Sequence, residues 1–254
     1  MDEAPVPKES RRERLLQLLV RDNLDFSAAA VNRFWAYLLG RGIVHPVDQM
    51  DSSHPASHPQ LLSWMALDFA KNGYNVRRLI RGVTASRAYQ LGSASSQDPP
   101  PQPATFARMN PKPLPAEALS RSLLVASGRT PDEAGTFTGI EEDSYRNPMV
   151  ERFPALFPEV VSPQVGQALF FTNNPLLDAL TDPEGDNVAA QMIAESDPSV
   201  RTRLAFSNVL CRQPYPDELK KTSSYFEARS ERAEDAVRQV LWALLASAEF
   251  RFNH

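Results

Sequence analysis

The 254-residue sequence has little cysteine, little glycine and no long apolar run, and each shortage excludes a class of protein. The single cysteine, Cys211, excludes an internal disulfide framework and a zinc site built from several cysteines. No Cys-x-x-Cys-His run occurs, so we expect no covalent haem. No apolar stretch approaches the roughly 18 residues of a bilayer-spanning helix, and the N-terminal residues do not have the pattern of a signal peptide. We therefore expect a soluble chain without a membrane span.

Charge is weakly segregated along the chain. The formal net charge is −4, from 27 basic and 31 acidic residues. Residues 1–91 hold 12 basic and 9 acidic side chains, and residues 92–254 hold 15 and 22, so the two parts carry +3 and −7. Nucleic-acid-binding domains are usually far more basic, with a pI above about 9. We therefore expect no nucleic-acid partner.

Apolar residues recur at helical spacing over most of the sequence. The periodicity and the capping residues predict N-terminal helices over 9–21, 27–39, 59–71 and 75–85, with Ser27 as a cap and Gly40 as a stop. Later helices are expected over 115–127, 163–171, 186–195, 198–210, 216–229 and 231–247, and one opens at Asn174-Pro175. We predict that 129–162 is irregular, because glycines and prolines interrupt it.

Six prolines lie between residues 92 and 113, a composition typical of a linker or an extended strap. The expected organisation is an N-terminal helical lobe (1–91), a proline-rich linker or strap (92–113) and a C-terminal helical lobe (114–254). The predicted fold class is therefore all-α, an irregular multi-helix bundle of two packed helical lobes with long proline-rich connections.

Several short segments resemble one known bacterial family. They include Asn32-Arg33-Phe34-Trp35, Gly40 to Val44, Pro46 to Asp48, Ser57 to Leu62 and the helix from Pro113 to Gly128. Looser matches follow at Asn173 to Pro175, Cys211 to Pro214 and Ala248 to Phe250. Over roughly 10–254 the chain resembles a planctomycete-type C-terminal domain of unknown function, the family found in large proteins that also carry cytochrome c-like modules. The family usually has a longer central region than 129–162.

The resemblance supplies a setting but no reaction. It implies a bacterial envelope or exported location and a protein partner, with a cytochrome-bearing module as one candidate. The leading hypothesis is a helical interaction module of uncharacterised activity from planctomycete-type envelope or redox-associated assemblies, with no cofactor.

One loop concentrates the side chains that bind metals. Three of the four histidines fall between residues 45 and 58, and the candidate ligands are His45, Asp48, Asp51, His54 and His58. Histidine and carboxylate ligands suit a divalent transition metal. This loop is the basis of an alternative hypothesis, a metal-dependent hydrolase-like enzyme acting on polysaccharide. The competing interpretation is a polar loop that wraps helix ends, with His58 as a helix cap.

Two further groups of side chains are candidate sites. Asn32, Arg33, Trp35 and Arg41 are candidates for a polar pocket, although Trp35 also fits a core position and Arg33 fits an ion pair with Asp48 or Asp51. The second group is a set of arginines on the helix over 75–85 and just beyond it. Arg77, Arg78, Arg81 and Arg87 are candidates for binding an anion or a sulfated glycan, or they form a solvated helix face.

Overall fold

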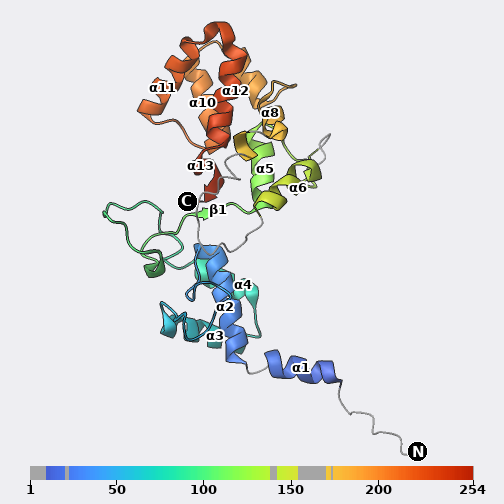
Figure 1. The fold of residues 1–254 in the computed structure, drawn as a ribbon, viewed down its shortest axis with the longest axis vertical. Coiled ribbons are helices and arrows are strands. Elements are labelled where there is room, and N and C mark those ends of the chain that lie inside the picture. The colour runs from blue at the N-terminus through green and yellow to red at the C-terminus, as the bar shows by residue number, and fades with distance from the viewer. Residues whose placement is uncertain (1–9, 21–22, 138–141, 154–169, 173, 254) are drawn as a thin grey trace, which may run out of the picture. The chain divides into compact units, whose positions relative to one another are not determined.

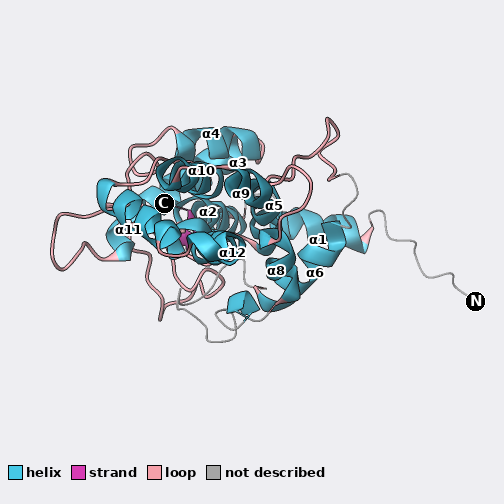
Figure 2. Cartoon of the chain, turned by 90° about the horizontal axis from the view of Figure 1, so that it is seen from above, coloured by secondary structure: helices cyan, strands magenta, loops and turns pink. Residues whose placement is uncertain are grey.

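The computed structural model describes residues 10–20, 23–137, 142–153, 170–172 and 174–253, and they fold as a multi-helix protein. The all-α prediction is confirmed, and Figures 1 and 2 show that helices dominate the described parts. Within these parts, no helix is both long and apolar enough to cross a bilayer. The helices of the N-terminal part are α1 (Arg11–Val20), α2 (Leu24–Leu39), α3 (Pro59–Lys71), α4 (Val76–Thr84) and the short 3-10 helix η1 (Pro103–Thr105).

The C-terminal part holds further helices and two very short strands. Its helices are α5 (Ala116–Ala126), α6 (Glu142–Arg152), α8 (Pro175–Thr181), α9 (Val188–Ala194), α10 (Pro198–Leu210), α11 (Pro216–Glu227), η2 (Ser230–Arg232), α12 (Ala233–Leu245) and α13 (Ala248–Arg251). The strands β1 (Lys112–Pro113) and β2 (Phe252–Asn253) pair with each other.

The described residues divide into two compact units. The first ends at Lys112 and the second begins at Pro113. Residues 92–112, which the sequence suggests as a linker or strap, belong to the first unit. Each unit has its own cluster of buried apolar side chains.

Helix α2 is the central element of the first unit. It begins one turn earlier than predicted, because Asn23 and not Ser27 is the N-cap. The Asn23 side chain accepts hydrogen bonds from the backbone N–H groups of Asp25 and Phe26. Ser27 is fully buried, and its hydroxyl donates to the Asn23 carbonyl. Gly40 ends the helix in the left-handed conformation, as predicted.

Side chains from a distant loop complete the C-terminal end of α2. The ammonium group of Lys112 donates to the carbonyl oxygens of Tyr37 and Leu38, at 3.0 and 2.9 Å. The Asn110 amide donates to the carbonyl of Leu39 at 3.2 Å. Carbonyls at the end of a helix have no partner within it, and a cation there also interacts favourably with the helix dipole. Residues 110 and 112 therefore tie the end of the proline-rich stretch to α2.

Helices α3 and α4 both pack on α2 and share its core. Val31, Trp35 and Leu39 of α2 are buried with Met65 and Phe69 of α3, among others. The ring of Phe106 packs edge-on against Trp35, with 5.3 Å between the ring centroids. Truncation of a buried tryptophan costs about 3–5 kcal/mol, so Trp35 contributes strongly to the stability of this unit.

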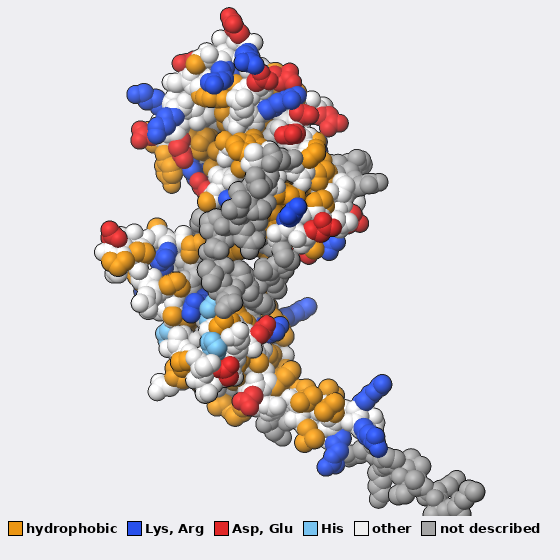
Figure 3. Space-filling view, in the orientation of Figure 1, with side chains coloured by type: hydrophobic (Ala, Val, Ile, Leu, Met, Phe, Trp, Pro, Cys, Tyr) orange, Lys and Arg blue, Asp and Glu red, His pale blue; other side chains and the backbone are white. Residues whose placement is uncertain are grey.

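Helix α1 leaves its apolar side chains exposed. Its sequence carries Leu15, Leu16, Leu18 and Leu19, but α1 has no buried residue and these leucines are 52–67% exposed. Figure 3 shows hydrophobic side chains on the surface of this helix beside basic ones. The Tyr74 hydroxyl donates to the Val20 carbonyl at 2.6 Å, so the end of α1 is tied to the segment before α4.

The second unit packs around α5, α10 and α12. Buried side chains from these helices include Leu123, Ala205, Val237 and Leu241. Gly128 has a positive φ of +91°, and an added Cβ would lie 2.8 Å from the backbone nitrogen of Val188. Only glycine therefore fits where the chain leaves α5 beside the start of α9.

The stretch 129–162 is more regular than predicted. Helix α6 forms there and includes Pro148, which the sequence analysis treated as an interruption. Met149 is almost fully buried, and its carbonyl accepts a hydrogen bond from the Phe153 N–H at 2.7 Å. Burial of this side chain offsets part of the cost of a proline inside the helix. The helix predicted over 163–171 lies mostly outside the described residues.

Arg212 joins three segments of the second unit. Its guanidinium contacts Glu218 of α11 at 2.8 Å and Glu249 of α13 at 2.6 Å. It also stacks 4.5 Å from the centre of the Tyr215 ring. The preceding residue, Cys211, has a left-handed backbone and is exposed.

Candidate functional site

The side chains of the 45–58 loop interact mainly with near neighbours. Asp48 forms an ion pair with Arg33 of α2 at 2.5 Å, one of the two alternatives expected. The Asp51 carboxylate accepts hydrogen bonds from the backbone N–H of Ser53 at 2.8 Å and from its hydroxyl at 2.5 Å, and it lies 3.1 Å from His54 Nδ1. The hydrogen bonds from Ser53 lower the pKa of Asp51 to about 2.

The five candidate metal ligands are not brought together as one set. In the part of the chain that the structure describes, no three His, Cys, Asp or Glu side chains form a group that could hold a metal ion. His58 occupies the N-cap position of α3, but its side chain makes no capping hydrogen bond, so the predicted capping role is wrong. Its Nδ1 lies 3.1 Å from the Ser57 hydroxyl, and its ring lies 5.7 Å from that of Phe106. Metal binding through His45, Asp48, Asp51, His54 and His58 stays a prediction.

The four residues of the candidate polar pocket have different surroundings. Asn32 is fully buried and binds the backbone of the following loop, whereas the Arg33 side chain is 55% exposed. Trp35 is 95% buried in the core of the first unit, and Arg41 is partly exposed just after α2. Asn32 and Trp35 are therefore structural elements of the fold, and a shared pocket of all four residues stays a prediction.

The four candidate anion-binding arginines lie on α4 and just after it. All four are exposed. Arg78 pairs with Asp68 of α3, with Nη2 to Oδ1 at 3.1 Å and Nε to Oδ2 at 3.3 Å. Among the described acidic residues, none forms an ion pair with Arg77, Arg81 or Arg87.

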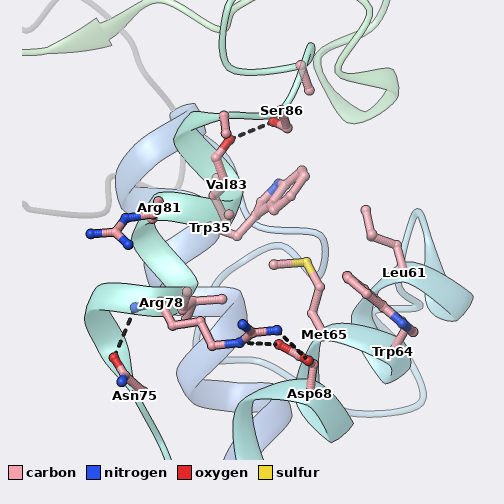
Figure 4. Close-up of a pocket in the computed structure, with 14 residues that line it drawn as sticks. Trp35, Leu61, Trp64, Met65, Asp68, Asn75, Arg78, Arg81, Val83 and Ser86 are labelled. Carbon is pink, nitrogen blue, oxygen red and sulfur yellow. Dashed lines mark hydrogen bonds and ion pairs between the residues drawn. The ribbon is translucent and has the colours of Figure 1, made fainter. Parts of the chain in front are cut away.

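A deep groove lies between α3 and α4, with α2 beneath it (Figure 4). It encloses about 810 Å³, within the range of known ligand sites. Most of its lining is apolar. The larger apolar side chains are Trp35, Leu61, Trp64, Met65, Leu79 and Val83. The Arg78–Asp68 ion pair closes one end, and Asn75, whose side chain caps α4 at the Arg78 N–H, lies beside it.

Trp35 is one of the lining residues of this groove. Its indole ring lies between α4 and the α3 side chains in Figure 4. Its Nε1 atom is buried out of reach of the groove and has no hydrogen-bond partner among the described residues. A buried donor without a partner costs about 1–3 kcal/mol, and most such groups in folded proteins are satisfied. Trp35 therefore contributes an apolar ring surface to the groove, while its N–H group lies inside the core.

Sequence reasoning missed the groove, although two of its residues gave a signal. Helical spacing places Trp64 on the apolar face of α3, yet it is 64% exposed at the groove. Gly82 lies inside α4 and lines the groove, and an added Cβ there would meet nothing within 4 Å. Glycine inside a helix costs about 1 kcal/mol relative to alanine. An exposed tryptophan and a helical glycine that the fold does not require are both features of a binding surface.

Comparison with known proteins identifies a family without an assigned function. The family model described as PSD1, protein of unknown function (DUF1553), matches residues 11–147, which include every lining residue of the groove. No curated protein and no solved structure matches the chain.

Proposed function

The chain belongs to the PSD1 family of proteins of unknown function (DUF1553), and we propose that it is a helical interaction module that binds through the groove between α3 and α4. The observation that carries this proposal is the apolar lining of the groove, in which Trp64 is 64% exposed. A ligand seated in the groove would bury this apolar surface, which favours binding.

The groove favours a ligand with a particular chemistry. Leu61, Trp64, Met65 and Leu79 would be covered by an apolar group, and Trp64 alone has 64% of its surface available for burial. Tryptophan is one of the residues that contribute most to binding energy at protein interfaces. The ligand therefore presents an apolar group to the groove.

Nile red is a suitable probe, because it is an apolar, uncharged dye whose fluorescence increases in an apolar environment. We expect it to bind the folded full chain with increased fluorescence. Trp64→Ala removes the most exposed aromatic side chain of the groove, and the affinity should fall about tenfold, which corresponds to about 1.4 kcal/mol. Gly82→Leu places a side chain in the groove and should abolish this binding.

Gly92→Leu is the matched control, because an added Cβ at Gly92 also meets nothing within 4 Å, but Gly92 does not line the groove. This variant should bind the dye with the same affinity as the unmodified chain. Any dye bound by the exposed leucines of α1 should be the same in both. Equal binding by the Gly82 and Gly92 variants would show that the groove is not the site and would refute the proposed function. Melting curves of all variants establish that each is folded.

We also propose the setting of this module. The resemblance through Asn32 to Trp35, Gly40 to Val44 and Ser57 to Leu62 supports a partner from planctomycete-type envelope or redox-associated assemblies, with a cytochrome-bearing module as one candidate. Purification of the complex from the source cells, followed by mass spectrometry, tests this setting. Recovery of the chain without any envelope or haem protein would contradict it.

The second candidate function is a metal-dependent, hydrolase-like activity on polysaccharide. The approach of His54 Nδ1 to Asp51 at 3.1 Å supports it, because neutral histidine and carboxylate are common ligands of zinc and iron. Asp48 is engaged by Arg33, so a metal would need to displace that ion pair to recruit it. Elemental analysis, described below, tests this candidate.

A further inference from the structure

The groove is long in one direction. Its lining on α4 extends from Asn75 at the N-cap to Ser86 just after the helix, a span of about 16 Å at 1.5 Å per residue. On α3 the lining runs from Leu61 to Asp68, a span of about 10 Å. The apolar anchors of an amphipathic helix at i, i+3, i+4 and i+7 also span about 10 Å.

The α4 side of the groove has small side chains where a partner would need to come close. Gly82 has no side chain, and Ala85, Ser86 and Ala88 follow it along the same wall. Small residues allow the backbones of two helices to approach closely, which increases their van der Waals contact. A Cβ at Gly82 would meet nothing, so the space above it is open to a partner.

We propose that the occupant of the groove is an amphipathic helix of a partner protein, with acidic residues along one side of its apolar stripe. This inference rests on the proposed function. Its apolar stripe lies on Trp64 and Met65 and against Gly82. The acidic residues then face the arginines of α4.

Positive charge on one edge of the groove determines which side of the partner helix carries acidic residues. Arg77 and Arg81 are one helical turn apart, so they form a basic edge on α4 beside the face that carries Arg78 and Gly82. Neither Arg77 nor Arg81 forms an ion pair with a described acidic residue, and Figure 4 shows the Arg81 side chain extending from α4 with no bond drawn to it. On the opposite edge, Leu61 and Trp64 of α3 are apolar, and the one acidic lining residue, Asp68, is paired with Arg78. Acidic residues are therefore expected on one side of the partner stripe only.

A second copy of this chain would not supply that helix through α1. Its exposed leucines would suit an apolar groove, but Arg11, Arg12 and Arg14 accompany them against the single Glu13. Like charges across an interface suppress association. The basic edge therefore disfavours α1 and selects an acidic helix.

The test uses the full chain and two synthetic peptides of about 18 residues, a length at which an isolated helix can form. Both carry the same leucine stripe, and one has glutamates along one side of it where the other has lysines. Fluorescence anisotropy should show at least tenfold tighter binding of the glutamate peptide at low salt, and about 0.5 M salt should reduce the difference. Gly82→Leu should abolish binding of both peptides, and Gly92→Leu should have no effect.

A double variant isolates the basic edge. Arg77→Gln with Arg81→Gln should remove the preference for the glutamate peptide, while Arg11→Gln with Arg14→Gln on α1 should retain it. Equal affinity for the two peptides, or binding that Gly82→Leu leaves unchanged, would overturn the inference. Nile red binding in the groove without binding of either peptide would overturn the helical partner but leave the proposed function standing. Heparin binding that depends on Arg77 and Arg81, without peptide binding, would assign these arginines to a sulfated glycan.

Discussion

Asn32 and Val44 pair through two hydrogen bonds, although one partner is a side chain and the other is backbone. The Val44 N–H donates to Asn32 Oδ1 at 2.9 Å, and Asn32 Nδ2 donates to the Val44 carbonyl at 3.0 Å. The same amide group also reaches the Val47 carbonyl at 3.3 Å. Because Asn32 is fully buried, this single side chain satisfies three backbone groups of the loop that follows α2.

We expect Asn32→Ala to destabilise the chain by about 3 kcal/mol or more, because three backbone groups would lose their partner in a buried site. Chemical denaturation followed by circular dichroism measures the loss. Asn208→Ala is the control, since Asn208 is exposed and donates only to the Leu204 carbonyl. A similar cost for the two variants would show that the loop does not depend on Asn32.

Arg212 should not be replaceable by lysine. Its planar guanidinium contacts Glu218 and Glu249 together and stacks on Tyr215, a geometry that an ammonium group cannot reproduce. We expect Arg212→Lys to cost about 1 kcal/mol, since all three charged side chains remain partly exposed. Arg232→Lys is the control, because Arg232 is 77% exposed and pairs only with Asp235. A loss of stability no larger than the control would contradict a structural role for Arg212.

The N-caps show how much of the fold local sequence predicts. Asn75, Asn174 and Asp197 cap their helices, and such caps are recognisable from sequence because a cap needs only a short polar side chain beside the first turn. Ser27 is not the N-cap of α2. Asn23, four residues earlier, has a side-chain oxygen that accepts hydrogen bonds from the first turn, so the helix begins before Ser27. The sequence did not predict helix α6, because a proline such as Pro148 disfavours a helix at its own position. The burial of Met149, which stabilises α6, depends on residues that are distant in the sequence.

The candidate site depends on long-range packing, and the sequence reveals little of it. Helical spacing places Trp64 on an apolar face but does not show whether a neighbouring helix covers it, and here none does. The unpartnered Nε1 of Trp35 likewise depends on which groups α4 brings near it. For Arg33, the short loop limited the expected ion-pair partners to Asp48 and Asp51, and the structure shows the pair with Asp48.

The Asp51 carboxylate should titrate far below an ordinary aspartate. Hydrogen bonds from Ser53 lower its pKa from 3.8 to about 2. The depressed pKa means that its contribution to stability is present above pH 4 and is lost as the pH falls through about 2. NMR titration of the carboxyl carbon measures the pKa directly. Ser53→Ala should raise it toward 3.8, and an unchanged value would rule out Ser53 as the cause.

Elemental analysis tests the metalloenzyme candidate. We expect protein purified without a His-tag or chelator to contain no stoichiometric transition metal, because the structure places Asp48 with Arg33 and His58 beside Ser57 and Phe106. His54→Ala should then leave the melting temperature nearly unchanged. A near-stoichiometric metal that is lost together with thermal stability in His54→Ala would instead establish a metal centre in the 45–58 loop.

The two glycines Gly82 and Gly128 should respond to alanine in opposite directions. At Gly82 the backbone is helical and an added Cβ meets nothing, so Gly82→Ala should stabilise the chain by about 1 kcal/mol. At Gly128 the φ of +91° and the 2.8 Å approach to the Val188 nitrogen make any side chain strained, so Gly128→Ala should destabilise by at least about 1 kcal/mol. Thermal unfolding of the two variants measures both effects. A destabilising Gly82→Ala would mean that the fold itself requires this glycine. A stabilising change would leave binding at the groove as the reason for a residue that costs the helix free energy.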